Sequence, residues 1–178
     1  MTMADIARWQ VAAWFDRKFD FSFPVELFPE LCMRLRGTPP RLEELVRGCP
    51  AERMVQAPQG QWSAQEHAGH LLDLEALWMA RVEDYVAGRS GMTPADLSNG
   101  GTFAAAHNTR PLEKILADFR KARFELVNRV ATLDRALFTR VLHHPRMKVP
   151  MRLVDHLFFV AEHDDHHLAI IWGMIRLP

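Results

Sequence analysis

The stretch WSAQEHAGHLLDLEALWMARVEDYVAG, residues 62–88, carries the clearest helix signal in the chain. Ser63 and Glu66 have the spacing of a capping box, in which each side chain bonds a free backbone N–H group of the first turn. Gly88 is a typical helix end. Apolar residues recur at helical spacing in between. The stretch therefore predicts a long amphipathic helix that must pack against other helices.

The same signals extend outward to further helices. Thr38 is the expected N-cap of a helix that two prolines open and Gly48 closes. Segments 111–133 and 151–175 have apolar stripes of helical period, and no stretch sustains a period of two. Four substantial helices predict an all-α fold, a four-helix bundle with extra N-terminal helical segments. The remaining segments are expected to be helices over 4–20 and 24–35, a loop over 49–61 and a proline-bounded turn over 143–150.

The connection from Arg89 to Arg110 is rich in Gly, Ser, Asn, Thr and Pro. Connections of about 20 residues are uncommon within a compact domain. One reason for such a length is that two neighbouring helices run parallel, so that the link must cross the bundle. We therefore expect a crossover connection here.

Length and charge restrict the class of protein. At 178 residues the chain fits a single domain. Lysine plus arginine (22) equals aspartate plus glutamate (22), so no basic excess is available for nucleic acid or an anionic membrane. Cys32 and Cys49 form neither a CxxC motif nor a disulfide framework, and no apolar run resembles a signal or membrane-spanning segment. We expect a cytoplasmic protein whose partner is a small molecule.

The sequence EHDDHHLAIIWGMI, residues 162–175, raises the question of a metal site. On a helical wheel at about 100° per residue, His163 and His167 fall beside the apolar stripe, whereas His166 leans toward solvent. Histidines spaced i, i+4 lie above one another on one helix face, as in metalloenzymes of the HExxH type. His163 and His167 are therefore candidate ligands of one ion.

Asp164 lies in the middle of that apolar stripe, where an ionised carboxylate is costly unless it is paired. Arg123 occupies a matching position in the stripe of the preceding helix. We infer that the two side chains face one polar pocket, either as a direct pair or with a shared ligand. The alternative is that Arg123 extends its guanidinium to the end of the bundle.

The capped helix contributes further candidates. His67 and His70 both fall within its apolar stripe, and periodicity does not separate them. Glu75 lies at the border and is expected to be a solvated acid. His156 is expected to be a core residue or a partner of the ligands. The remaining histidines, His107, His143 and His144, are assigned to loops.

Three converging imidazoles favour a mononuclear metal site. A purely structural polar cluster is the alternative. Three protein nitrogens with an open fourth position are typical of catalytic zinc-type sites. Neutral imidazole also suits nickel, iron or copper. A di-iron bundle requires ExxH motifs, which the sequence lacks, and a c-type haem requires CxxCH, which is also absent.

Four segments resemble the DinB-like (YfiT-like) superfamily of metal-binding four-helix bundles: WSAQEHAGHLLDLE, AHNTRPLEKILADFRKAR, HPRMKVPMRLVD and FVAEHDDHHLAII. The first and last are the specific ones, because they contain a Trp-Ser helix start with an internal His-Leu and a late His-x-x-x-His. The resemblance runs from about residue 38 to the end. Residues 1–37 lie outside it.

The resemblance implies a ligand set and a topology. The histidine followed by leucine matches His70, and the paired histidines match His163 and His167. An up-down-down-up bundle is implied, in agreement with the long crossover, and often a homodimer. Some members are S-transferases that use a thiol such as bacillithiol or mycothiol, others resemble maleylpyruvate isomerase, and many have no assigned activity.

The leading hypothesis is a metal-dependent transferase. His70, His163 and His167 would hold one divalent ion, zinc or nickel first and iron as an option, which activates a low-molecular-weight thiol or water. Arg123 would anchor an anionic group, and Asp164 or Glu75 would orient a histidine or accept a proton. The alternatives are a hydrolase and a non-catalytic metal-binding or dimerising domain, for which a closed fourth ligand such as His67 would argue.

Overall fold

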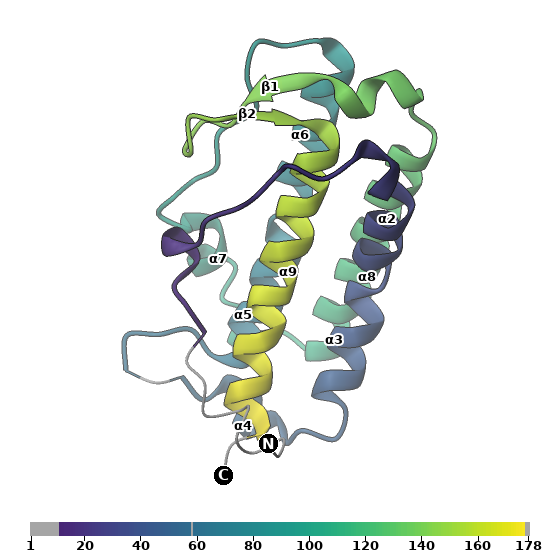
Figure 1. Ribbon diagram of the computed structural model, residues 1–178. Coiled ribbons are helices and arrows are strands. Elements are labelled where there is room, and N and C mark those ends of the chain that lie inside the picture. Colours follow the sequence, from purple (N-terminus) through teal and green to yellow (C-terminus); the bar gives the residue numbers. More distant parts are fainter. Residues whose placement is uncertain (1–10, 58, 177–178) are drawn as a thin grey trace, which may run out of the picture.

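The computed structural model describes residues 11–57 and 59–176, and shows a bundle built from four helical rods (Figure 1). The first and second rods each consist of two consecutive helices. The bundle elements are α2 (Phe28–Arg36) with α3 (Thr38–Val46), α5 (Ala64–Asp73) with α6 (Glu75–Ala87), α8 (Leu112–Ala131) and α9 (Leu153–Arg176). The predicted all-α four-helix bundle is confirmed.

The rods follow the predicted up-down-down-up order. The second rod (α5 and α6) and α8 run in the same direction, while the first rod and α9 run in the opposite one (Figure 1). The connection 89–110 therefore returns along the whole length of the bundle before α8 begins. Its length follows from this topology, because a parallel neighbour cannot be reached by a short loop.

The predicted helix over residues 62–88 forms with one interruption. Ser63 Oγ accepts from the backbone N–H of Glu66, and Glu66 accepts from the backbone N–H of Ser63, so the capping box is present. Leu74 separates α5 from α6. Its backbone stays in the right-handed helical region, and it still donates to His70 and accepts from Trp78. The break is therefore local, and both helices remain in one rod.

Several short elements were not predicted. Helix α4 (Ala51–Val55) lies within the expected loop 49–61, and α7 (Gly100–Ala104) lies within the crossover. Strands β1 (Val141–His143) and β2 (Pro150–Arg152) pair as an antiparallel hairpin around the expected turn. These elements are too short for periodicity to show them. Burial of one side chain each, such as Met54 in α4 and Leu142 in β1, fixes them instead.

The N-terminal segment differs from its expected helix. Residues 1–10 lie outside the described part. Residues 11–24 are extended apart from a 3₁₀ turn at Trp14–Asp16, and this stretch lies across α9 in Figure 1. Trp14 packs its ring against Phe159, and Arg17 forms an ion pair with Glu162. Contacts with α9 therefore decide the conformation of residues 11–24.

The crossover is docked onto α5 through His107. This side chain is fully buried, and its Nε2 lies 2.8 Å from Oδ2 of Asp73. The ring occupies the space above Gly69, where an added Cβ atom would lie 2.2 Å from it. Only glycine leaves room for this approach, so one small residue lets the crossover reach the helix that carries His70. His107, which we expected in a loop, begins a 3₁₀ turn (His107–Thr109) within the crossover, and its side chain is buried.

No helix among residues 11–57 and 59–176 combines the length and the apolar character needed to cross a membrane.

Candidate metal centre

Three histidines from two helices meet inside the bundle. His70 comes from α5, and His163 and His167 come from adjacent turns of α9. Each can offer one ring nitrogen such that the three nitrogens lie within 4.8 Å of one another, and all three side chains are buried. The Nε2 atoms of His163 and His167 are 3.1 Å apart. The structure thus brings together the three histidines selected from the sequence.

The second nitrogens of two of these rings are held by neighbours. His70 Nδ1 lies 3.0 Å from Oγ1 of Thr102, which comes from α7 of the crossover. His167 Nδ1 lies 2.9 Å from Nδ1 of His67. Such partners fix the ring orientation and the tautomer of a ligand histidine. His67 therefore faces the far side of His167 and does not close the centre as a fourth ligand.

The histidines are electrically neutral near pH 7. Burial, reinforced by the neighbouring imidazoles, places the pKa of His163 and His167 well below the usual range of histidine. Burial is also the main reason why the pKa of His70 falls to about 4. A neutral imidazole keeps a free lone pair, which is the form that binds metal.

These features fit a divalent transition ion. Because Nδ1 of His167 is in contact with His67 and Nδ1 of His70 is in contact with Thr102, Nε2 of both rings is left to offer a lone pair to an ion. No carboxylate belongs to the cluster that could hold an ion among the described residues. A set of three imidazoles suits zinc, nickel, iron or copper and does not suit magnesium or calcium, which prefer oxygen ligands.

Of the other two histidines of α9, one is buried as the periodicity predicts and one is not exposed as predicted. His156 is fully buried, as expected for a core residue, between Trp78 and Tyr85. His166 was expected to face solvent, and this was wrong, because it is only 8% exposed. The ring of Trp14 from the N-terminal segment covers it, with the ring centroids 5.5 Å apart. A helical wheel contains no information about a covering segment.

Arg123 and Asp164 form a direct buried ion pair, together with Glu75. Nε of Arg123 lies 3.0 Å from Oε1 of Glu75, and Oγ1 of Thr38 donates to Asp164 at 2.8 Å. Arg123 and Asp164 are both 0% exposed. The expectation that Glu75 is a solvated acid was wrong, because Arg123 draws it into the core at 4% exposure.

The buried ion network of Arg123, Asp164 and Glu75 does not reach the space where a substrate could bind. Arg123, Asp164 and Glu75 are absent from the lining of the cavity beside the histidines. Their charges are satisfied within the protein, so Arg123 has no free face for an external anion. Their contacts link α2, α3, α6, α8 and α9, which places the group between all four rods.

The pH dependence of stability should reveal this group. Burial raises the pKa of Glu75 to about 7, although Arg123 opposes the shift. The folded state then holds a proton that the unfolded state releases above a pKa of 4.5, so the free energy of unfolding decreases as pH rises from about 4.5 to 7. We expect Glu75→Gln to remove roughly 3 kcal/mol of this decrease, since each pKa unit corresponds to about 1.4 kcal/mol.

Urea unfolding of metal-free protein at pH 5 and pH 8 gives the decrease in the free energy of unfolding between the two pH values. The effect is the difference between this decrease in wild type and in Glu75→Gln. Glu113→Gln, at an exposed position of α8, is the matched control and should leave the pH dependence as it is. An identical decrease in wild type and Glu75→Gln would show that Glu75 ionises normally in the core.

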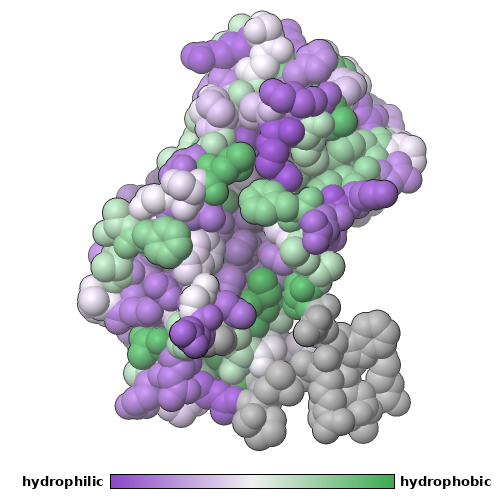
Figure 2. All heavy atoms as spheres, turned by 90° about the vertical axis from the view of Figure 1, so that its left-hand side faces the viewer, coloured by the Kyte–Doolittle hydropathy of each residue, from purple (hydrophilic) through white to green (hydrophobic). Residues whose placement is uncertain are grey.

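A cavity of about 280 Å³ opens beside the histidines. Figure 2 shows the corresponding face of the molecule hollowed near its middle, between patches of hydrophobic surface. His70, His163 and His167 line the cavity, and aromatic rings form much of the wall. The ring centroids of Trp14 and Trp62 lie 5.0 Å from His163 and 4.7 Å from His70, respectively. The centre is thus accessible to a small molecule through an aromatic cavity.

Sequence reasoning missed part of this cavity. Trp14 and Phe15 belong to the N-terminal segment, and His144 and Arg146 belong to the hairpin turn, which was assigned to a loop. The first segment was expected to be a helix over 4–20 and the second a turn, and neither expectation indicated that the two segments meet at a cavity. Arg81 on α6 could have been found, because on the wheel it falls about 20° from His70, on the same inward face.

Comparison with known proteins agrees with this architecture. YfiT from Bacillus subtilis, described as "a probable metal-dependent hydrolase with an unusual four-helix bundle topology", has a similar structure with a TM-score of 0.79. It is 20% identical, and the match covers 90% of this chain and 92% of YfiT. A crystal structure of a Streptococcus pneumoniae protein has a TM-score of 0.60 at 14% identity, covering 90% and 94% of the two chains.

These structures share the fold with this chain. No curated protein matches the sequence. Residues 34–171, which include the three clustered histidines, the second rod and most of α9, match the DinB superfamily. The chain therefore belongs to the DinB superfamily.

Proposed function

We propose that this protein is a metal-dependent enzyme in which His70, His163 and His167 hold one divalent transition ion. The observation that carries the proposal is that three buried, neutral imidazoles converge in the wall of an open cavity. A purely structural ion would be enclosed by a fourth protein ligand. Here the remaining side faces space that a small molecule can enter, and His67 is bonded to the far side of His167.

The ion and the protein would have separate tasks. A divalent ion on three imidazoles supplies Lewis acidity, which lowers the pKa of a coordinating thiol or water and so provides a nucleophile near neutral pH. Thr102 and His67 keep two of the rings in the required tautomer. The tryptophans beside the centre exclude bulk water, which strengthens electrostatic interactions within the cavity.

The favoured reaction is transfer of an electrophilic group to a low-molecular-weight thiol. The apolar aromatic wall next to the histidines suits a substrate with a planar or apolar body. The second candidate is hydrolysis, which is supported by the description of YfiT as a probable metal-dependent hydrolase. In both cases, Arg123 and Asp164 would act by holding α8 and α9 in place, because neither lines the cavity.

A turnover assay distinguishes these reactions. Protein loaded with zinc or nickel is offered an aryl halide electrophile with and without a thiol, and separately an activated ester. We expect metal-dependent turnover of the electrophile that requires the thiol and is lost in protein stripped with a chelator. Ester turnover without thiol would establish the hydrolase instead. No metal-dependent turnover of either substrate would contradict the proposal that the protein is an enzyme.

A variant of a histidine outside the cavity provides the control for this assay. His143→Ala removes an exposed histidine of the hairpin that is outside the cavity, so its turnover should match wild type. If His143→Ala lost turnover as fully as the chelator-stripped protein, the active metal would be bound adventitiously at the surface.

A further inference from the structure

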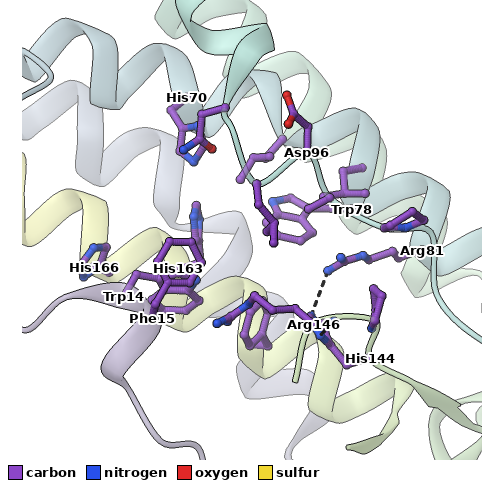
Figure 3. A pocket seen from close by; sticks show the side chains of 18 of the residues that line it. Trp14, Phe15, His70, Trp78, Arg81, Asp96, His144, Arg146, His163 and His166 are labelled. Atoms are coloured by element: carbon purple, nitrogen blue, oxygen red, sulfur yellow. Dashed lines mark hydrogen bonds between the residues drawn. The ribbon is translucent and has the colours of Figure 1, made fainter. Parts of the chain in front are cut away.

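The far end of the cavity has a chemistry of its own. Arg81 of α6, together with His144 and Arg146 of the hairpin turn, lines the wall on the side opposite His70 and His163 in Figure 3. Trp78 and Phe159 line the space between the two ends. The three clustered imidazoles thus occupy one end, and two arginines together with His144 occupy the other, with an aromatic stretch in between.

Arg81 is buried without a carboxylate partner. Its side chain is only 1% exposed, and its Nε donates to the carbonyl of Thr93 at 2.9 Å. No acidic group of residues 11–57 and 59–176 forms a salt bridge with it. Asp84, one turn away, instead accepts from Thr93 and pairs with Arg89. A buried guanidinium without a counterion is costly, so this arrangement calls for an anion from outside.

The tautomer of His144 strengthens this conclusion. Its Nδ1 accepts from the backbone N–H groups of Arg146 and Met147, at 3.3 and 3.2 Å. Burial and the two nearby arginines lower the pKa of His144 to about 3, so the ring is neutral. Because two backbone N–H groups donate to Nδ1, we assign its single proton to Nε2. This Nε2 lies 3.4 Å from NH1 of Arg81, along the dashed line in Figure 3.

In this tautomer two donors face each other, because guanidinium nitrogens never accept hydrogen bonds. The contact between Arg81 and His144 leaves both N–H groups without an acceptor from each other. An oxyanion placed against both would accept from each of them. Donors that converge without an acceptor are what an anion site requires.

Arg146 adds a second positive charge at the same end. Its guanidinium lies 4.8 Å from the ring of Phe15, and no salt bridge to it occurs in the described part of the chain. Asp96 is the one acid on the cavity wall, and its carboxylate oxygens accept from Ser98 and Gly100. The carboxylate of Asp96 is thus held by its own loop, and the charge of the two arginines remains available.

The geometry points to a subsite for the carboxylate of an aromatic or otherwise planar organic acid, formed by Arg81, His144 and Arg146. The acid group would bind between these side chains while the body of the molecule packs along Trp78 and Phe159 toward the histidines. This inference rests on the proposed function, because it specifies the substrate class of the same cavity. It also transfers to Arg81 the anchoring of an anion that the sequence suggested for Arg123.

Binding of 3-phenylpropionate, compared with its uncharged analogue 3-phenylpropanamide, tests the subsite. Calorimetric titration of wild type should show the acid binding about 10- to 100-fold more tightly than the amide, as expected for hydrogen bonds to a charged group. Arg81→Gln and Arg146→Gln should each reduce this preference at least several-fold. Arg36→Gln, which removes an arginine stacked on Phe124 away from the cavity, is the matched control and should keep it.

Three outcomes would overturn the inference. The first is equal affinity of wild type for acid and amide. The second is an acid preference that both Arg81→Gln and Arg146→Gln retain. The third is binding of inorganic phosphate as tight as that of 3-phenylpropionate, which would indicate a site for free anions. Should Arg81→Gln fail to fold by circular dichroism, Arg146→Gln decides.

Repeating the titration after chelation separates this inference from the proposed function. A preference for the acid that persists in chelated protein supports the arginine subsite whether or not the histidines bind metal. A preference that vanishes on chelation and is unchanged in Arg146→Gln would place the carboxylate on the ion. That result would overturn the subsite and leave the proposed metal centre intact.

Discussion

Replacing His163 with alanine is expected to abolish stoichiometric metal binding. His163 supplies one of the three nitrogens that converge on the centre among the described residues, and the other two come from His70 on α5 and His167 on α9. Loss of an orienting partner alone costs about 10- to 100-fold in metal affinity, so loss of a direct ligand should cost at least about 100-fold. Elemental analysis after gel filtration should give one ion per chain in wild type and close to none in His163→Ala.

Thermal unfolding provides a second readout of the same change. Metal at 100 times its dissociation constant adds about 2.7 kcal/mol to the free energy of unfolding, so added zinc should raise the Tm of wild type clearly. His163→Ala should show almost no such rise, while His143→Ala should behave as wild type. One ion per chain retained in His163→Ala would place the metal elsewhere and remove the basis of the proposed function.

Replacing Arg123 with methionine is expected to destabilise the fold by about 3 to 5 kcal/mol. The substitution leaves Glu75 and Asp164 buried without their counterion, and removing one partner of a buried ion pair has an effect of this size. Much of the stability of a domain is lost in this way. Urea unfolding at neutral pH measures the change.

Arg120→Met is the matched control for this prediction. Arg120 lies on the same helix and pairs with Glu43, but both side chains are partly exposed, at 37% and 31%. A surface pair contributes at most about 1 kcal/mol, so this variant should remain close to wild type. Adding Glu75→Gln and Asp164→Asn to Arg123→Met should recover part of the loss. Similar stabilities of Arg120→Met and Arg123→Met would contradict the account of a buried network.

The buried ion network also explains how the histidines of the candidate metal centre are oriented. Asp164 lies between His163 and His167 in sequence, and its side chain points toward Arg123 and Thr38. The ion pair therefore fixes the rotation of α9 about its axis. That rotation turns His163 and His167 toward His70, so residues without access to the cavity can still determine the geometry of the centre.

The sequence by itself determined the features that depend on local geometry. The capping box, the rods and the inward direction of His163 and His167 follow from backbone hydrogen bonding within a helix, which repeats every 3.6 residues whatever surrounds it. The length of the crossover indicated the topology for a similar reason, because chain connectivity limits how neighbouring helices can be joined. Fold class and two of the three clustered histidines were accessible in this way.

The tertiary structure decided what depends on segments that meet from afar. Periodicity could not separate His67 from His70. In the structure His70 belongs to the cluster of three converging ring nitrogens, whereas His67 contacts Nδ1 of His167. His166 became buried only because the N-terminal segment crosses α9. The pairing of Arg81 with His144 joins residues 63 positions apart. Such contacts depend on loop paths and on packing between elements, and neither leaves a periodic trace in the sequence.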